Sequence, residues 1–239
     1  VSIYGVANRF QTAGQVTSSG WEFKAEYDVI KNENLTYETG LIFYNNKVVL
    51  DKFSNELAQY GFLGSPGQNA VTMVRVKVGD ELGQIYGPVF DGVNADGSIK
   101  FKDVTGDGTL NTDSGNVLQD DYDGEVLGSG YPTLEMSWSN YIDFGKGWSV
   151  NAFFRGAFGH SLINTFRAFY EPNVPSQTSY NQMNTSLREP TLGVAQYSSL
   201  YVEKADFFLL DNLTISKQII LPEGSGIKDL TVSLNALRP

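Results

Sequence analysis

The sequence predicts an all-β fold: an antiparallel transmembrane β-barrel with long extracellular loops, of which this chain supplies part of the wall. Two observations predict it, a strict alternation of apolar and polar residues and a marked inequality among the connections. Residues 21–29, WEFKAEYDV, carry aromatic or aliphatic side chains at odd positions and a charge at every even position. Successive side chains of a strand point to opposite faces, so one face is apolar and the other charged. A barrel needs an apolar, aromatic-rich face toward lipid and a polar face toward its lumen.

Six segments share this pattern and are long enough to cross a bilayer when tilted, which takes about ten residues. One face of the second carries Leu35, Tyr37, Thr39, Leu41 and Phe43, and the apolar face of the fourth carries Trp148, Val150, Ala152, Phe154 and Phe158. In the third segment, Leu134, Met136, Trp138 and Ile142 oppose Glu135, Ser137, Ser139, Tyr141 and Asp143. The six predicted spanning strands are 21–30, 35–50, 131–144, 148–158, 207–220 and 227–237.

The connections between these segments fall into two classes. Tight turns are predicted at 31–34, 145–147 and 221–226. Short turns on one side and long loops on the other are typical of outer-membrane barrels, with the turns periplasmic and the loops extracellular. Additional strands are predicted at 1–9 and 71–78, with small strands inside 79–102. The predicted extracellular loops are 51–70, 79–130 and 159–200.

Composition excludes several other classes. Hydrophobic residues make up 41% of the chain and its mean hydropathy is −0.22, without the run of about 18 apolar residues that a spanning helix needs. Aromatic residues reach 13%, which suits interfacial girdles. The chain has no cysteine, so disulfides and thiolate metal sites are excluded. A net charge of −10 argues against nucleic acid as a partner.

One acidic loop resembles a calcium-binding loop of the EF-hand or dockerin type. Residues 103–113, DVTGDGTLNTD, place oxygen-bearing side chains at alternate positions and a glycine at position six. Position twelve is Ser114, and the nearest carboxylate, Asp113, comes one residue early. The alternative is an Asp/Gly-rich turn held by hydrogen bonds from the backbone to side chains. The candidate Ca²⁺ ligands are Asp103, Thr105, Asp107, Thr109, Asn111 and Asp113.

Nothing in the sequence supports catalysis, and the chain is predicted not to be an enzyme. His160 is the single histidine, and a solvated loop position explains it better than a catalytic triad. The acidic run 120–123 is interpreted as a solvated loop. Tyr170, Tyr180 and Tyr197, with Arg167, could stack on a sugar or peptide, although ordinary loop packing would also explain them.

Several segments, in order along the chain, resemble the C-terminal half of SusC/RagA-type TonB-dependent transporters. They are NNKVV (45–49), VGDELGQIYGPVFDGV (78–93), FKDVTGDG (101–108), AFFRGAFG (152–159) and YVEKADFFLLDNLTI (201–215). The chain departs from the family pattern at Thr105, where Asn or Asp is usual, and in its final residues.

The resemblance implies a bacterial outer-membrane barrel whose N-terminal plug domain is pulled by the TonB complex. It also implies a SusD-like surface lipoprotein that caps the barrel, oligosaccharide or peptide cargo, and contact with outer-membrane lipid. The plug domain is absent from this chain, and Val1, which opens inside a β-like run, suggests a fragment.

Two alternatives stay open at the level of sequence. One is a secreted β-sandwich that binds carbohydrate and is stabilised by calcium, and the other is a passive porin-like barrel. Sandwich strands usually run about five or six residues, which is shorter than the strands predicted here.

Overall fold

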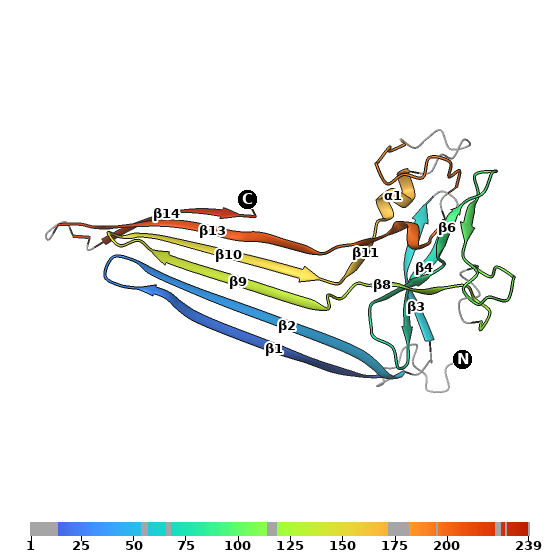
Figure 1. Ribbon diagram of the computed structural model, residues 1–239, viewed down its shortest axis with the longest axis horizontal. Coiled ribbons are helices and arrows are strands. Elements are labelled where there is room, and N and C mark those ends of the chain that lie inside the picture. Colours follow the sequence, from blue (N-terminus) through green and yellow to red (C-terminus); the bar gives the residue numbers. More distant parts are fainter. Residues whose placement is uncertain are drawn as a thin grey trace, which may run out of the picture. The chain divides into compact units, whose positions relative to one another are not determined.

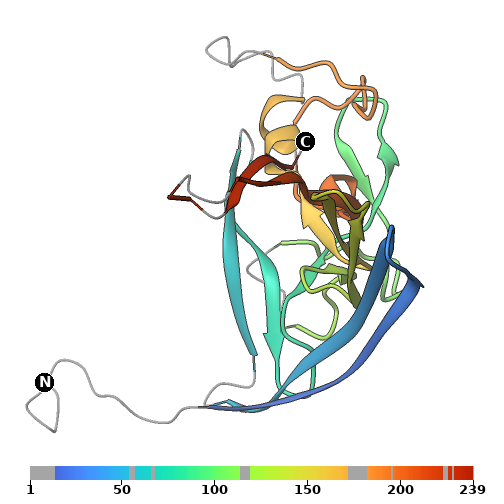
Figure 2. The ribbon, with the colours of Figure 1, turned by 90° about the vertical axis from the view of Figure 1, so that its left-hand side faces the viewer.

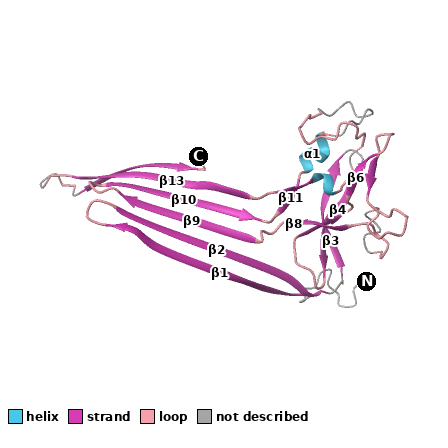
Figure 3. Ribbon diagram, viewed as in Figure 1, coloured by secondary structure: helices cyan, strands magenta, loops and turns pink. Residues whose placement is uncertain are grey.

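The computed structural model describes residues 14–53, 57–65, 68–113, 119–171, 182–194, 196–222, 226–227 and 229–238. These residues are mostly antiparallel strand, and helix is confined to α1 (Thr165–Tyr170) and the 3-10 turn η2 (Ser199–Tyr201), as Figure 3 shows. No helix in the described part of the chain is long and apolar enough to cross a membrane. The strands are β1 (Gly14–Lys31), β2 (Thr36–Phe53), β3 (Leu57–Ser65), β4 (Gln68–Lys77), β5 (Gln84–Gly87), β6 (Phe90–Val93), β7 (Ile99–Phe101), β8 (Glu125–Ser129), β9 (Leu134–Asp143), β10 (Trp148–Phe158), β11 (Ser161–Ile163), β12 (Val202–Lys204), β13 (Phe207–Ile220) and β14 (Asp229–Leu237).

The chain divides into two compact units. The first, here called the loop unit, contains residues 1–19, 47–130 and 161–203. The second, here called the sheet unit, contains residues 20–46, 131–160 and 204–239. Nearly all of the sequence predicted to form long loops therefore belongs to one unit, and most of the predicted spanning segments belong to the other.

The sheet unit is built on one six-stranded sheet of order β1-β2-β9-β10-β13-β14 (Figure 1). The pairs β2–β9, β9–β10, β10–β13 and β13–β14 are antiparallel. Strands β1 and β14 are its two edges, seen at opposite ends of the sheet in Figure 2, so the described residues do not close the sheet. At roughly 3.3 Å per residue, the 18-residue strands β1 and β2 each extend about 60 Å. That exceeds the thickness of a bilayer.

The strand register confirms the predicted facing of the side chains. Trp138 in β9 lies opposite Leu41 in β2 and Phe154 in β10. The next residue, Ser137, lies opposite Ile42 and Arg155. Residues directly opposite each other share a face of the sheet, so the apolar and polar series predicted for these strands continue across the strands that the register joins.

The two described tight turns have the chemistry that their sequences predict. The Asn32 side chain accepts hydrogen bonds from the backbone N–H groups of Asn34 and Leu35, both at 2.9 Å. In the second turn, Gly145, Lys146 and Gly147 all have positive φ, at 69°, 52° and 78°. Glycine adopts this conformation without a steric penalty, which explains the Gly-Lys-Gly sequence.

The limits of the predicted strands agree to different degrees: β1, which contains the clearest alternation, begins at Gly14 and not at residue 21 as predicted. Strands β10 and β13 have the predicted limits, whereas the prediction of an unbroken loop over 51–70 is wrong. Strand β2 extends to Phe53, and β3 pairs with β4 as an antiparallel hairpin. The small strands predicted inside 79–102 are present as β5, β6 and β7. Segment 159–200 also contains β11 and α1, and the strand predicted at 1–9 lies outside the described residues.

The loop unit has a small apolar core of its own. Its buried cluster combines side chains from β4, β5, α1 and the segment leading into η2. The strand order β3-β4-β5-β8 forms the larger sheet of this unit, and β6 pairs with β7 separately. The core residues are Met73, Ile85, Ala168, Tyr197 and Tyr201.

Candidate functional site

The apolar face of the six-stranded sheet is exposed. Trp21 and Phe23 in β1 expose 54% and 56% of their surface, and Leu234 in β14 exposes 71%. The rings of Trp138 and Phe154 stack with centroids 5.0 Å apart, and Phe208 continues the row at 5.6 Å. Soluble domains cover continuous apolar faces of this kind, whereas lipid contact requires them. The β-sandwich alternative fails here, because a sandwich would bury this face in its core.

Polar side chains on the apolar face bond to one another. Asn140 is buried, and its side-chain oxygen accepts hydrogen bonds from the hydroxyls of Tyr37 at 2.9 Å and Thr39 at 3.2 Å. The indole N–H of Trp138 donates to the Thr39 hydroxyl at 2.8 Å. A surface facing hydrocarbon needs this internal pairing, because lipid tails offer polar groups no partner. The three bonds suit a lipid-facing position, although the buried side-chain nitrogen of Asn140 has no hydrogen-bond partner among the described residues.

The opposite face is polar and carries hydrogen bonds between neighbouring strands. The Tyr44 hydroxyl donates to Glu135 at 2.7 Å, and the Thr214 hydroxyl donates to the side-chain oxygen of Asn235, also at 2.7 Å. Arg155 forms an ion pair with Asp211 at 3.4 Å. These groups suit a surface in contact with water, as the lumen of a barrel requires.

A hollow of about 450 Å³ opens on the sheet around Gly40. A Cβ at Gly40 would lie 2.8 Å from the Ser139 hydroxyl, which would have to move, and in ordinary contact with the Cγ of Glu26 at 3.5 Å. The lining is mainly polar and acidic: Glu26, Tyr27, Asp28, Glu38, Thr39, Gly40, Ser139, Asn140, Tyr141 and Asn151.

The candidate calcium loop is held together by its own backbone. The Asp103 carboxylate accepts hydrogen bonds from the N–H groups of Gly106 at 2.5 Å and Gly108 at 2.8 Å. Asp107 accepts one from the N–H of Thr109 at 2.7 Å. Among the described residues, no group of three or more His, Cys, Asp or Glu side chains is placed to hold a metal ion. The geometry is that of the Asp/Gly-rich turn, and calcium binding by Asp103, Thr105, Asp107, Thr109, Asn111 and Asp113 stays a prediction.

Asp123 also holds this loop, although it lies 12 to 19 residues further along the chain. Its carboxylate is fully buried and accepts hydrogen bonds from the backbone N–H groups of Val104, Thr105 and Asn111 at 2.8 to 3.0 Å. Desolvation by burial raises the pKa of Asp123, but these hydrogen bonds to the charged form outweigh it and leave the pKa below its usual value. The prediction that the run 120–123 is a solvated loop is therefore wrong at Asp123, and also at Tyr122, which is buried.

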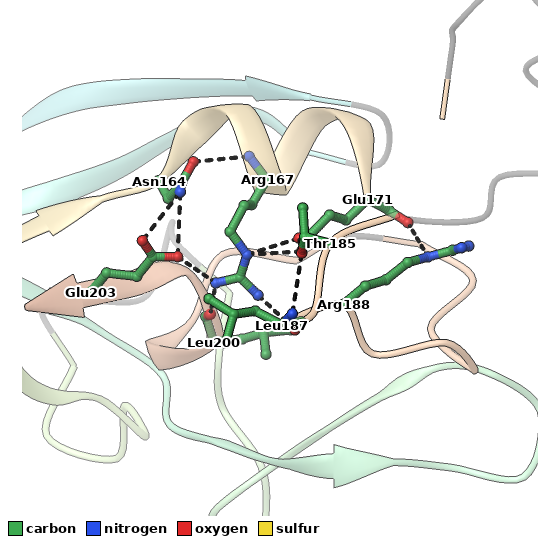
Figure 4. A network of polar contacts seen from close by, with 8 residues as sticks. All are labelled: Asn164, Arg167, Glu171, Thr185, Leu187, Arg188, Leu200 and Glu203. Atoms are coloured by element: carbon green, nitrogen blue, oxygen red, sulfur yellow. Dashed lines mark hydrogen bonds and ion pairs between the residues drawn. The ribbon is translucent and has the colours of Figure 1, made fainter. Parts of the chain in front are cut away.

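A second buried network fixes α1 within the loop unit (Figure 4). The Arg167 guanidinium forms ion pairs with Glu171 at 2.9 Å and Glu203 at 2.6 Å. It also donates to the carbonyl oxygens of Leu187 at 2.8 Å and Leu200 at 3.2 Å. These contacts use four of the five N–H donors of the guanidinium, so Arg167 holds segments of the loop unit together.

The aromatic residues considered as cargo contacts are packed in the loop unit. Tyr197 is buried, and its hydroxyl donates to the backbone oxygens of Met73 and Tyr86. Tyr170 packs against Phe166 with ring centroids 4.6 Å apart. The packing alternative therefore holds for Arg167 and Tyr197, while Tyr180 lies outside the described residues.

His160 lies between β10 and β11 and is not solvated. Its side chain is only 11% exposed, and its Nδ1 atom lies 4.0 Å from the carboxylate of Asp206. The prediction of a solvated loop residue is wrong, because the ring packs edge-on against Phe207.

Comparisons with known proteins agree with the architecture. The chain is 24% identical over 237 residues to TonB-dependent receptor P3 of Formosa agariphila, covering 92% of this chain and 23% of the receptor. TonB-dependent receptor P26 of the same organism is 25% identical over 184 residues, which cover 67% of this chain and 16% of that receptor. No family model matches the chain.

Solved structures give the same result for the fold. The RagAB peptide transporter superposes with a TM-score of 0.73 at 19% identity, covering 99% of this chain and 26% of that one. The RagAB peptide importer in its "open-open" state gives 0.72 at 19% identity, with the same coverage. The chain thus spans about a quarter of the length of these relatives.

The fold is that of a partial transmembrane β-barrel wall with elaborate loops. The comparisons also confirm the resemblance to the C-terminal portion of SusC/RagA-type TonB-dependent transporters that the sequence motifs predict.

Proposed function

We propose that this chain forms part of the barrel wall of an outer-membrane, TonB-dependent importer. The observation that carries the proposal is the two-faced sheet: its apolar face is exposed along strands long enough to cross a bilayer, and its opposite face is polar. The match to TonB-dependent receptors over 92% of the chain supports the same class. In this proposal, both the plug domain and the contact with the TonB complex belong to other parts of a longer protein.

The proposed cargo is an oligosaccharide or a peptide, received from a SusD-like surface lipoprotein. The similar RagAB structures are of a peptide importer, which supports the peptide class and a two-protein assembly. Within this chain, the polar face would line the path of the cargo, and the loop unit would stand on the extracellular side. Its buried ion pairs and separate core suit a rigid rim, and no catalytic step is proposed.

Membrane insertion is tested first with the complete protein that contains this chain. We expect it to fractionate with the outer membrane, to need detergent for extraction, and to migrate differently on gels before and after heating. A protein that purifies without detergent and runs unchanged after heating would contradict the barrel assignment.

Uptake separates the importer from the porin-like alternative. We expect accumulation of labelled oligosaccharide or peptide to stop when the proton-motive force is collapsed or TonB is deleted. A passive barrel would continue to equilibrate small solutes in both conditions. Deletion of the gene for the SusD-like lipoprotein then tests the proposed partner, because import should fall while the amount of barrel in the membrane stays constant.

A further inference from the structure

One lysine on the apolar face of the sheet has apolar residues on all sides. Lys217 in β13 lies opposite Trp148 in β10 and Val232 in β14. Along its own strand, the residues that share its face are Ile215 and Ile219, both exposed apolar residues. A cation within an apolar band is unfavourable unless its charged end reaches a polar environment. The position of the Lys217 ammonium therefore needs an explanation.

The ammonium of Lys217 is directed to the turn end of the sheet. Its Nζ donates a hydrogen bond to the backbone carbonyl of Lys146, in the turn at 145–147. The same Nζ lies 5.1 Å from the centre of the Trp148 ring, which is half-exposed. An ammonium has three N–H donors, and the carbonyl accepts only one of them. The cation is thus fixed at the rim with further donors available.

A second lysine, Lys146, lies in the turn whose backbone carbonyl accepts the hydrogen bond from Lys217. Lys146 is exposed at the tip of the turn with φ of 52°, a conformation that glycine or asparagine adopts more easily than lysine. The nearest acidic side chain in sequence, Asp143, accepts a hydrogen bond from the N–H of Gly145 at 2.7 Å. The turn therefore presents a positive charge without a compensating carboxylate at its tip.

The two lysines of β1 behave differently. Lys24 pairs with Glu26 at 2.9 Å, and Lys31 pairs with Asp28 at 2.8 Å. Within the described part of the sheet unit, Lys146 and Lys217 have no such ion pair. In the same described part, Lys204 at the end of β12 also has no ion pair, whereas Lys146 and Lys217 both lie where the apolar face meets the turns.

We propose that Lys146, Lys217 and Trp148 form a binding site for the headgroup of an acidic phospholipid, in the leaflet that the turns face. The lipid phosphate would accept hydrogen bonds from the two ammonium groups. Its acyl chains would lie along the exposed apolar residues Ile215, Val232 and Leu234, and the indole would occupy the interface, where tryptophan is enriched. Charge complementarity selects the occupant, because two cations favour a lipid with net negative charge over a zwitterionic one. This inference rests on the proposed membrane location.

The test uses the complete protein reconstituted into nanodiscs that contain phosphatidylglycerol and phosphatidylcholine. Lipids retained after transfer to detergent are counted by native mass spectrometry. We expect the protein to retain phosphatidylglycerol preferentially, and we expect each of K146Q and K217Q to reduce that preference by about fivefold. K217R should restore it. K24Q, which alters a lysine paired on the polar face, is the matched control and should leave the preference unchanged.

The outcomes separate this site from the proposed function. A protein that does not enter nanodiscs contradicts the membrane location itself. A protein that enters them and retains both lipids equally, or keeps its preference in the K146Q/K217Q double variant, overturns the lipid site alone. Displacement of the lipid by inorganic phosphate at millimolar concentration would show a general anion site and would also overturn it. Heat-modifiable migration of each variant confirms that it has folded.

Discussion

The two units place their apolar and charged residues in opposite ways. In the sheet unit, large apolar side chains such as Trp21 and Leu234 are exposed and therefore do not contribute to a buried core. In the loop unit, Tyr201 and Ala168 are almost completely buried, and so is the charged side chain of Arg167. A water-soluble fold needs its apolar residues inside, whereas a membrane wall needs them outside. One chain thus follows two sets of rules, which broadly correspond to the two units, although Leu162, Phe166 and Leu187 of the loop unit are also exposed.

The largest expected effect lies in the loop unit and tests whether its buried charges are structural. Arg167→Ala leaves the buried Glu171 without its partner, and removing one member of a buried ion pair typically costs about 3–5 kcal/mol. In the complete protein, limited proteolysis should cut the loop unit much faster, while heat-modifiable migration of the barrel stays unchanged.

Arg238→Ala is the control for this prediction, because its side chain is 73% exposed and its ion pair with Asp211 is long. It should leave the proteolysis rate close to that of the unaltered protein. Equal rates for R167A and R238A would show that the Arg167 network contributes nothing.

The second-largest expected effect tests whether the apolar face of the sheet contacts lipid and the opposite face contacts water. Leu41→Arg and Val150→Arg place a charge on the apolar face, at a cost of about 2–4 kcal/mol near the bilayer midplane and less toward its surfaces. Ser137→Arg and Asn151→Arg, on the polar face, should cost much less. Unfolding by urea in detergent or lipid gives these free energies, and equal costs on both faces would contradict the two-faced wall.

Asp123 gives a smaller and pH-dependent effect. Its pKa is lowered in the folded protein, so its stabilising contribution is complete above the ordinary carboxyl pKa of about 3.9 and is lost as the pH falls through the folded value. Asp123→Asn should cost about 1–3 kcal/mol at neutral pH, because a buried set of backbone donors loses its charged acceptor. The rate of proteolysis of the loop unit should rise at acid pH in the unaltered protein and change less in D123N. Parallel pH profiles for the two proteins would contradict this role.

The contrast between the sheet unit and the loop unit also explains which parts of the structure could be predicted from the sequence. Alternation is a local signal, and the six predicted spanning segments all fall on strands, with β10 and β13 correct to the residue and β1 beginning seven residues earlier than predicted. Strand β3 was missed because its polar and Gly/Pro-bearing surroundings resemble a loop, whereas its partner β4 overlaps the strand predicted at 71–78. The role of Asp123 has no local signal, since its donors lie 12 to 19 residues earlier in the chain. Sequence thus identified the wall well, whereas long-range contacts determine the loop unit.

The smallest expected effect concerns calcium at the loop that begins with Asp103. Extracellular calcium sites have dissociation constants of about 10⁻⁴ to 10⁻³ M, so 1 mM Ca²⁺ would stabilise the loop unit by roughly 0.4–1.4 kcal/mol. Proteolysis of the loop unit in the complete protein should slow on addition of Ca²⁺ and recover its rate with a chelator, and Asp107→Asn should weaken this response. Mg²⁺ serves as the control ion, because it demands a tighter octahedral geometry. If Ca²⁺ has no effect while Asp103→Ala still accelerates cleavage, the backbone hydrogen bonds to Asp103 alone hold the turn.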